Sequence, residues 1–157
     1  MFIRRILAAF AVFAVVAVAP VRLHAQAPAV SLAKATAIKC TFSLMAVGTW
    51  GKEKPEAQIK PVSETMVFEG INADEGTAQL KSNYGGKYDI IVRYANGYLH
   101  LIQSFLDGHL YTTTILEKTT ANGKLRAMHS RHEYTDAKLP GWTSSPEQYY
   151  GECEVIK

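Results

Sequence analysis

The sequence predicts an all-β protein: a small antiparallel up-and-down barrel or closed sandwich of about eight strands. Three observations lead to this prediction. Short runs rich in β-branched and aromatic residues alternate apolar with polar side chains, which is the pattern of a strand with one buried face. Dipeptides typical of tight turns separate several of these runs. No helical period of ten or more residues follows the N-terminal apolar segment.

Eight runs are expected to form the strands. The first alternates Ile38, Cys40, Phe42 and Leu44 with polar residues, so these four should share the buried face. The second and third flank the turn-rich stretch NADEG, and the last closes the chain. The expected strands are 38–46, 64–71, 77–82, 88–94, 98–106, 109–117, 124–132 and 149–156.

Three hairpin turns are expected between residues 88 and 132. Asn96-Gly97, Asp107-Gly108 and Asn122-Gly123 all tolerate the positive φ that a two-residue turn requires. Four consecutive strands joined in this way form an up-and-down meander, and about eight strands suffice to close a small barrel.

The first 25 residues have the three parts of a secretory signal. Arg4 and Arg5 precede an unbroken apolar run at 6–19, and small residues that a signal peptidase accepts follow. Such a run rises about 21 Å as a helix, short of the ~30 Å bilayer core, so a cleaved signal is favoured over a membrane anchor. We expect a signal peptide at 1–25, a flexible leader at 26–37 and a single β domain at 38–156, periplasmic or secreted.

The charge of the exported chain excludes some partners. The whole chain has 17 Lys+Arg against 14 Asp+Glu, and three of the arginines lie in the signal region, which leaves 14 of each sign. A neutral chain without a basic cluster is a poor binder of nucleic acid or of an anionic membrane surface. Charged residues on mixed faces of the strands also disfavour an outer-membrane barrel.

Cys40 and Cys153 are the only cysteines, and export would place them in an oxidising compartment. They are too far apart for a CxxC redox pair, and a disulfide is favoured over a thiolate metal site. First and last strands are neighbours in a closed barrel, so this disulfide would join the strands where the sheet closes. The mature chain should begin near Gln26 or Pro28 and contain no free thiol.

Two resemblances can be stated on short motifs. SRH (130–132), followed by PEQYYGEC (146–153) and preceded by the Thr-rich YTTTIL (111–116), resembles uncharacterised small exported β-barrel-like proteins of alphaproteobacteria. This resemblance implies an exported location and one disulfide, and it supplies no activity. Gly48-Thr49-Trp50 is similar to the G-x-W of lipocalin-type barrels, in which a late arginine, here Arg131, packs over the tryptophan. In this chain the tripeptide follows a strand instead of opening one.

The stretch RAMHSRHEY (126–134) holds the most reactive side chains. His129 and His132 have H-x-x-H spacing, but residues i and i+3 of a strand point to opposite faces, so we expect no shared metal ion. Ser130 and His129 face apart for the same reason, and the chain has no Gly-x-Ser-x-Gly elbow. No metal and no cofactor are therefore expected.

Two-residue turns fix the register of the meander. Leu101 would then lie opposite Val92 and Thr114, Thr114 opposite Arg131, and His129 opposite Leu116. Ser130 and His132 would point away from the interior. A three-residue loop at Asp107-Gly108 is the alternative, and it would turn Thr112 and Thr114 outward. With two-residue turns, the face that should be interior carries Tyr88, Ile90, Val92, Tyr94, Leu99, Leu101, Gln103, Phe105, Leu110, Thr112, Thr114, Leu116, His129 and Arg131.

A buried Arg131 must be paired, because an isolated buried charge costs several kcal/mol. Its partner would be a threonine hydroxyl, a backbone carbonyl, or an acid from EYTDAK or PEQYYGEC. Two interpretations stay open. The cluster is a structural network that closes one barrel end, or it lines a ligand pocket. The candidate ligand-binding residues are His129, Arg131, Thr112, Thr114 and Gln103.

The function expected from the sequence is that of an exported binding or interaction module. Its ligand would be a small molecule in the barrel mouth or an envelope protein on the rim, and the chain itself would be monomeric. The alternative is an enzyme with an unfamiliar site around His129 and Arg131. A deep polar pocket would favour the enzyme, and a filled interior with an exposed aromatic patch would favour the binding module.

Overall fold

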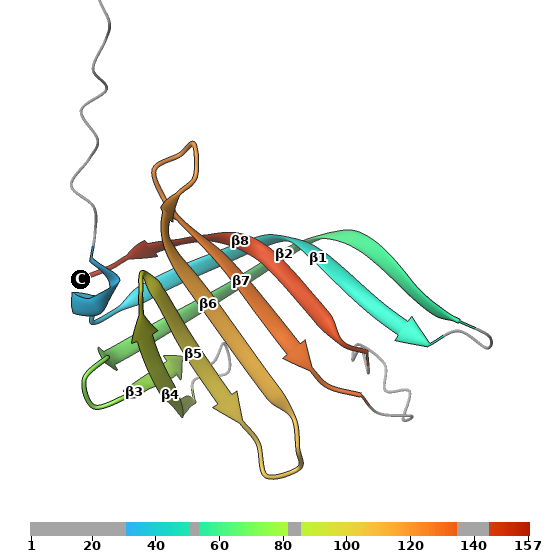
Figure 1. Ribbon diagram of the computed structural model, residues 1–157, viewed down its shortest axis with the longest axis horizontal. Helices are drawn as coiled ribbons and strands as arrows, with labels where there is room; N and C mark the ends of the chain where they lie inside the picture. The colour runs from blue at the N-terminus through green and yellow to red at the C-terminus, as the bar shows by residue number, and fades with distance from the viewer. Residues whose placement is uncertain (1–30, 51–53, 82–85, 135–144) are drawn as a thin grey trace, which may run out of the picture.

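The computed structural model describes residues 31–50, 54–81, 86–134 and 145–157 (Figure 1). Within them, eight antiparallel strands form one sheet that closes into a barrel in chain order. A short 3-10 helix, η1 (Leu32–Lys34), precedes the strands. The strands are β1 (Ile38–Trp50), β2 (Pro55–Asn72), β3 (Thr77–Lys81), β4 (Lys87–Ala95), β5 (Tyr98–Ser104), β6 (Leu110–Thr119), β7 (Leu125–His132) and β8 (Glu147–Val155). The predicted all-β barrel is confirmed, and each expected strand is present.

Apolar side chains from η1 and from all eight strands fill the interior of the barrel. Leu32 lies in the range that the sequence assigned to a flexible leader, yet it is completely buried and its backbone N donates to Glu117 Oε1 over 2.7 Å. The helix η1 therefore closes one end of the barrel. The predicted signal peptide at 1–25 lies outside the described residues and stays a prediction. No helix of the described segments is long and apolar enough to cross a membrane.

The sheet closes where β1 pairs with β8. Cys40 lies directly opposite Cys153, and the two form the predicted disulfide, with Cα atoms 4.0 Å apart. Gly151 of β8 lies opposite Phe42, and a Cβ added there would lie 2.1 Å from the backbone O of Thr41. Only glycine therefore fits at this point of the seam.

A β-bulge at the seam changes which residues of β1 face inward. The register of β1 shifts between Phe42 and Leu44 against both of its neighbours. Ile38 and Phe42 are buried before the bulge, whereas Met45 and Val47 are buried after it. The prediction that Leu44 shares the buried face is therefore wrong, because the bulge turns it outward.

The meander departs from the predicted register at its second hairpin. The Asn96-Gly97 turn has two residues as predicted and places Val92 opposite Leu101. At Asp107-Gly108 the backbone N of Phe105 bonds to O of His109, which leaves a three-residue loop. This is the alternative that turns Thr112 and Thr114 outward. Leu101 consequently faces Thr113, and Ile115, instead of Leu110 or Leu116, enters the core.

The third hairpin also departs from the predicted register, and its shift compensates for the shift at the second hairpin. Thr120 N bonds to O of Lys124, and a further register shift lies between Leu116 and Thr119. His129 therefore lies opposite Thr113, and Arg131 lies opposite Tyr111. The predicted partners Leu116 and Thr114 were wrong. Because both hairpins shift, His129 and Arg131 still face the interior side, while Ser130 and His132 face outward.

β1 and β2 extend further than the sequence indicated, and together they form an arm that projects from the barrel (Figure 1). Pairing continues from Leu44 opposite Pro61 to Trp50 opposite Pro55. This extension was missed because prolines and charged residues, which are disfavoured inside sheets, interrupt the sequence at 55–61.

The disulfide should supply much of the stability of the barrel. The loop between its cysteines spans 113 residues, which corresponds to about 4–5 kcal/mol in the chain-entropy model. We expect the Cys40→Ala/Cys153→Ala variant, and separately the reduced natural chain, to lose that amount in urea unfolding. A loss below about 1 kcal/mol in both would contradict a stabilising role of the closure.

Candidate functional site

Polar side chains gather at the barrel end opposite η1. Two successive rungs of the β6–β7–β8 ladder supply most of them: Thr113, His129 and Tyr149 in one rung, and Tyr111, Arg131 and Glu147 in the next. Glu133 follows directly after β7 and is also buried. The seven side chains are called the polar cluster below.

Arg131 joins the two carboxyl groups of the polar cluster. Its Nη2 lies 3.3 Å from Tyr111 Oη and 3.4 Å from Glu133 Oε2, and its Nη1 lies 3.6 Å from Glu147 Oε2. The guanidinium also lies over the Tyr111 ring, 4.8 Å from its centroid. Both glutamate side chains are 2% exposed. The predicted acid partner is thus present twice, once from EYTDAK and once from PEQYYGEC.

Each glutamate accepts a hydrogen bond from a tyrosine. Tyr111 Oη donates to Glu133 Oε2, and Tyr149 Oη donates to Glu147 Oε2. Burial, together with the hydrogen bond to Glu147, raises the pKa of Tyr149 to about 12. Burial and the hydrogen bond to Glu133 raise the pKa of Tyr111 in the same direction. Both phenols therefore stay protonated at neutral pH and remain donors.

His129 is sealed inside the barrel. It is 2% exposed, and its ring contacts those of Phe42, Tyr111 and Tyr149. Its Nδ1 lies 2.9 Å from Thr113 Oγ1, and its buried Nε2 has no hydrogen-bond partner among the described residues. Burial, aided by the charge of Arg131, lowers its pKa to about 4, so the ring is neutral at physiological pH. A substrate would reach this ring only if the barrel end opened.

The structure brings together three of the five predicted ligand-binding residues. His129 and Arg131 belong to the polar cluster, and Gln103 lies opposite Tyr111 on the same side of the sheet. Thr112 and Thr114 lie on the outer face, where Thr114 Oγ1 is 3.0 Å from His100 Nδ1. Sequence reasoning did not single out Tyr111, Glu133, Glu147 or Tyr149. Glu133 lies two residues after Arg131, and Tyr149 lies two residues after Glu147. Residues two apart in a strand share a face, so this spacing could have placed both glutamates on the inner face.

Arg131 and Trp50 do not form the contact that the lipocalin-like tripeptide predicted. Arg131 lies over Tyr111, whereas Trp50 is 63% exposed and meets the ring of Tyr134 edge-on, with centroids 5.5 Å apart. Trp50 and Tyr134 instead form an aromatic pair at the tip of the arm.

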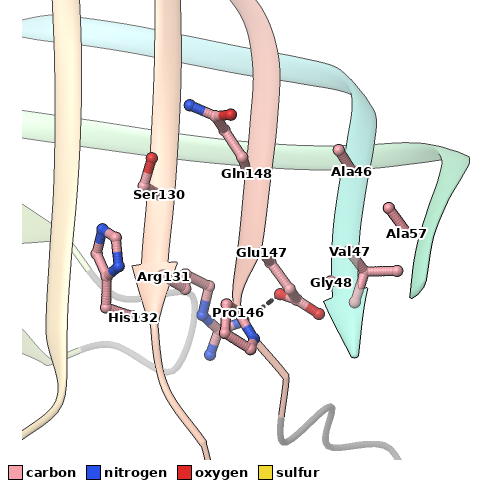
Figure 2. A pocket seen from close by; sticks show the side chains of 10 residues that line it. All are labelled: Ala46, Val47, Gly48, Ala57, Ser130, Arg131, His132, Pro146, Glu147 and Gln148. Carbon is pink, nitrogen blue, oxygen red and sulfur yellow. Dashed lines mark ion pairs between the residues drawn. The ribbon is translucent and has the colours of Figure 1, made fainter. Parts of the chain in front are cut away.

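A hollow of about 310 Å³ adjoins the polar cluster at the sheet rim, and we call it the rim hollow. Arg131 and Glu147 form the last pair of the β7–β8 ladder, so the sheet ends there. Figure 2 shows their ion pair on one side of the hollow, with Ala46 and Ala57 on the other side. The hollow is lined by Ala46, Val47, Gly48, Ala57, Ser130, Arg131, His132, Pro146, Glu147 and Gln148.

The outer face of the arm is apolar along its full length. Directly paired residues share a face, and this face of β1 and β2 consists of Leu44, Ala46, Gly48, Trp50, Pro55, Ala57, Ile59 and Pro61, called the arm face. Ile59 is 73% exposed. On the opposite face, β2 carries the exposed Glu56, Gln58 and Lys60, whereas β1 carries the buried Met45 and Val47. A second hollow of about 150 Å³ is lined by Gly48, Thr49, Trp50, Pro55, Glu56 and Pro146.

The comparisons with known proteins do not test the two resemblances that the sequence suggested, and both stay predictions. No family model matches the chain, and neither a curated protein nor a solved structure matches it. In the part of the chain that the structure describes, no three His, Cys, Asp or Glu side chains are grouped so that they could hold a metal ion.

The buried state of His129 predicts acid destabilisation. Its folded-state pKa of about 4 lies below its ordinary value of 6.5. Between these values the unfolded chain binds a proton that the folded chain does not, so stability is lost as pH falls from about 6.5 to about 4, by about 3 kcal/mol in all. His129→Gln should remove this part of the pH dependence in urea unfolding, whereas His109→Gln, in a hairpin loop, keeps His129 and serves as the control. Equal pH dependence in His129→Gln and the natural chain would refute this assignment.

Removal of Arg131 should leave two buried carboxyl groups without their cationic partner. We expect Arg131→Met to destabilise the barrel by about 3–5 kcal/mol, because a buried pair that loses one partner leaves an uncompensated charge. Arg126→Met on the same strand, where the arginine is exposed and its Nε donates to Thr119 O, should cost less than about 1 kcal/mol. Adding Glu133→Gln and Glu147→Gln to Arg131→Met should restore part of the loss. Unfolding midpoints decide the matter, and an unchanged midpoint in Arg131→Met would rule out the structural network.

Proposed function

We propose that this protein is a binding module whose ligand docks on the arm face and in the rim hollow. The observation that carries the proposal is the polarity of β2 in the arm. The eight outward residues of the arm carry no charge, while Glu56, Gln58 and Lys60 of β2 lie on the other face. A face in contact with water alone has no reason to be continuously apolar, and exposed apolar patches with polar rims are typical of interaction sites.

The distribution of space in the barrel supports binding over catalysis. The interior is occupied by apolar side chains, and the polar cluster is tied together by its own hydrogen bonds and ion pairs. The rim hollow lies at the edge of this packed interior, where Arg131 and Glu147 of the polar cluster line it together with Ala46, Gly48 and Ala57. The exposed pair of Trp50 and Tyr134 stands at the tip of the arm. A filled interior with an exposed aromatic patch is the arrangement expected of a binding module.

We further propose that the module works outside the cytoplasm. The disulfide between Cys40 and Cys153 supports this, because such bonds persist in oxidising compartments. The basic and apolar N-terminal segment of the sequence supports it as well.

A fragment screen followed by amide chemical shifts tests the binding site. Small apolar and aromatic fragments should shift the amides of Ala46, Gly48 and Ala57. Ala57→Trp fills the rim hollow from an exposed position, and we expect it to weaken these fragments at least tenfold. Ala95→Trp places the same side chain at an exposed, outward position of β4 and should leave their binding unchanged.

Two results would count against the proposed site. Amide shifts confined to the opposite side of the barrel would show that the fragments bind there instead. Equal binding of the fragments by both tryptophan variants would show that they do not occupy the rim hollow. Thermal unfolding of each variant establishes that both remain folded.

A further inference from the structure

We infer that the natural occupant of the arm face is a short extended peptide segment of another protein, with apolar side chains at positions i and i+2. This inference rests on the proposed function and names the class of partner. It follows from the spacing of the two hollows, from the polar groups beside them and from the size of the arm face.

The two hollows lie side by side along β1. Both are lined by Gly48 and Pro146, and the larger reaches Ala46 while the smaller reaches Trp50. Their centres are therefore offset by about two residues along the strand, or roughly 6.7 Å. Side chains i and i+2 of an extended peptide point the same way at this same spacing. One such peptide, running along β1, would place one apolar side chain in each hollow.

The polar residues next to the larger hollow suit an extended backbone. Ser130, His132 and Gln148 bring a hydroxyl, an imidazole and an amide nitrogen to one side of it, while the Gln148 amide oxygen accepts from Tyr150 Oη over 2.7 Å. An extended peptide has backbone N–H and C=O groups that need partners, whereas those of a helix are satisfied within the helix. Figure 2 shows Ser130 and Gln148 projecting from neighbouring strands above the Arg131–Glu147 pair.

The size of the arm face disfavours a second copy of the chain. The arm face consists of eight residues. Each partner of a stable protein–protein interface contributes about 20–30 residues. A peptide with two apolar anchors needs far fewer, so the arm face fits a peptide and is too small for a stable dimer.

The free edge of β2 is a less suitable docking position than the arm face. Among the described strands, the part of β2 from Pro55 to Pro61 pairs only with β1, which leaves its other edge open. That segment carries two prolines, Glu56 and Lys60, the residue types that block strand addition at sheet edges. The partner is therefore expected to contact the face of the arm.

Selection of peptides from a random ten-residue display library, with the full folded protein as bait, tests the inference. Enriched peptides should share an apolar-x-apolar pattern. Gly48 borders both hollows, and a Cβ added there meets nothing closer than Pro146 O at 4.0 Å. Gly48→Leu should therefore fold normally, occupy both hollows and weaken the selected peptides at least tenfold.

A matched pair of isoleucines provides the control. Ile59→Asp on the arm face should weaken the peptides at least tenfold, whereas Ile91→Asp, at an exposed isoleucine of β4, should leave their affinity unchanged. In the peptides themselves, moving the second apolar residue from i+2 to i+3 should also cost at least tenfold.

Four results would overturn the inference. The first is enrichment of peptides without the pattern, and the second is equal affinity for Gly48→Leu and the natural chain. The third is co-sedimentation with phosphatidylcholine–phosphatidylglycerol vesicles that Ile59→Asp abolishes, which would indicate a membrane surface. The fourth is a concentration-dependent dimer abolished by Ile59→Asp, which would indicate a second copy. If fragments bind the rim hollow and no peptide is enriched, the inference fails and the proposed function stands.

Discussion

Strand β1 pairs with β2 along one edge and with β8 along the other, and this double pairing closes the sheet. The bulge after Phe42 lies within it, at the place where Gly151 lets the backbones of β1 and β8 approach closely. Before the bulge, side chains of β1 such as Ile38 and Phe42 enter the core, and after it the inward set moves by one residue. Without that shift Leu44, Ala46, Gly48 and Trp50 would point inward. The arm face thus originates in the closure of the barrel.

The two barrel ends are closed by different means. At one end Leu32 supplies apolar packing and its backbone bonds to Glu117. At the other end one guanidinium is shared between two buried carboxyl groups, each held by a tyrosine. Buried ionic networks contribute little net stability compared with well-packed apolar residues, but they tolerate the loss of a member poorly. The polar cluster therefore fixes the positions of β7 and β8, whose ends form part of the rim hollow.

The sequence was informative about strands and less so about register. Alternation and turn dipeptides located all eight strands, because these signals are local, and the count of two cysteines predicted the disulfide. Gly108 and Gly123 take the positive φ that three-residue loops as well as two-residue turns require, so loop length could not be read from these dipeptides. The inward positions of His129 and Arg131 were predicted correctly only because two register errors offset each other. The bulge, which leaves no mark in the composition of β1, hid the arm face.

Gly48 and Gly151 differ in whether the fold leaves room for a side chain at their positions. At Gly151 a methyl group would overlap the backbone of β1, whereas at Gly48 it would lie in ordinary contact with Pro146 O. Both glycines lie next to β1–β8 contacts, yet only one is a fixed point of the architecture. The residues of the arm face lie outside the buried core cluster. Under the proposed function, substitutions there change the preferred ligand while the core and the disulfide stay the same.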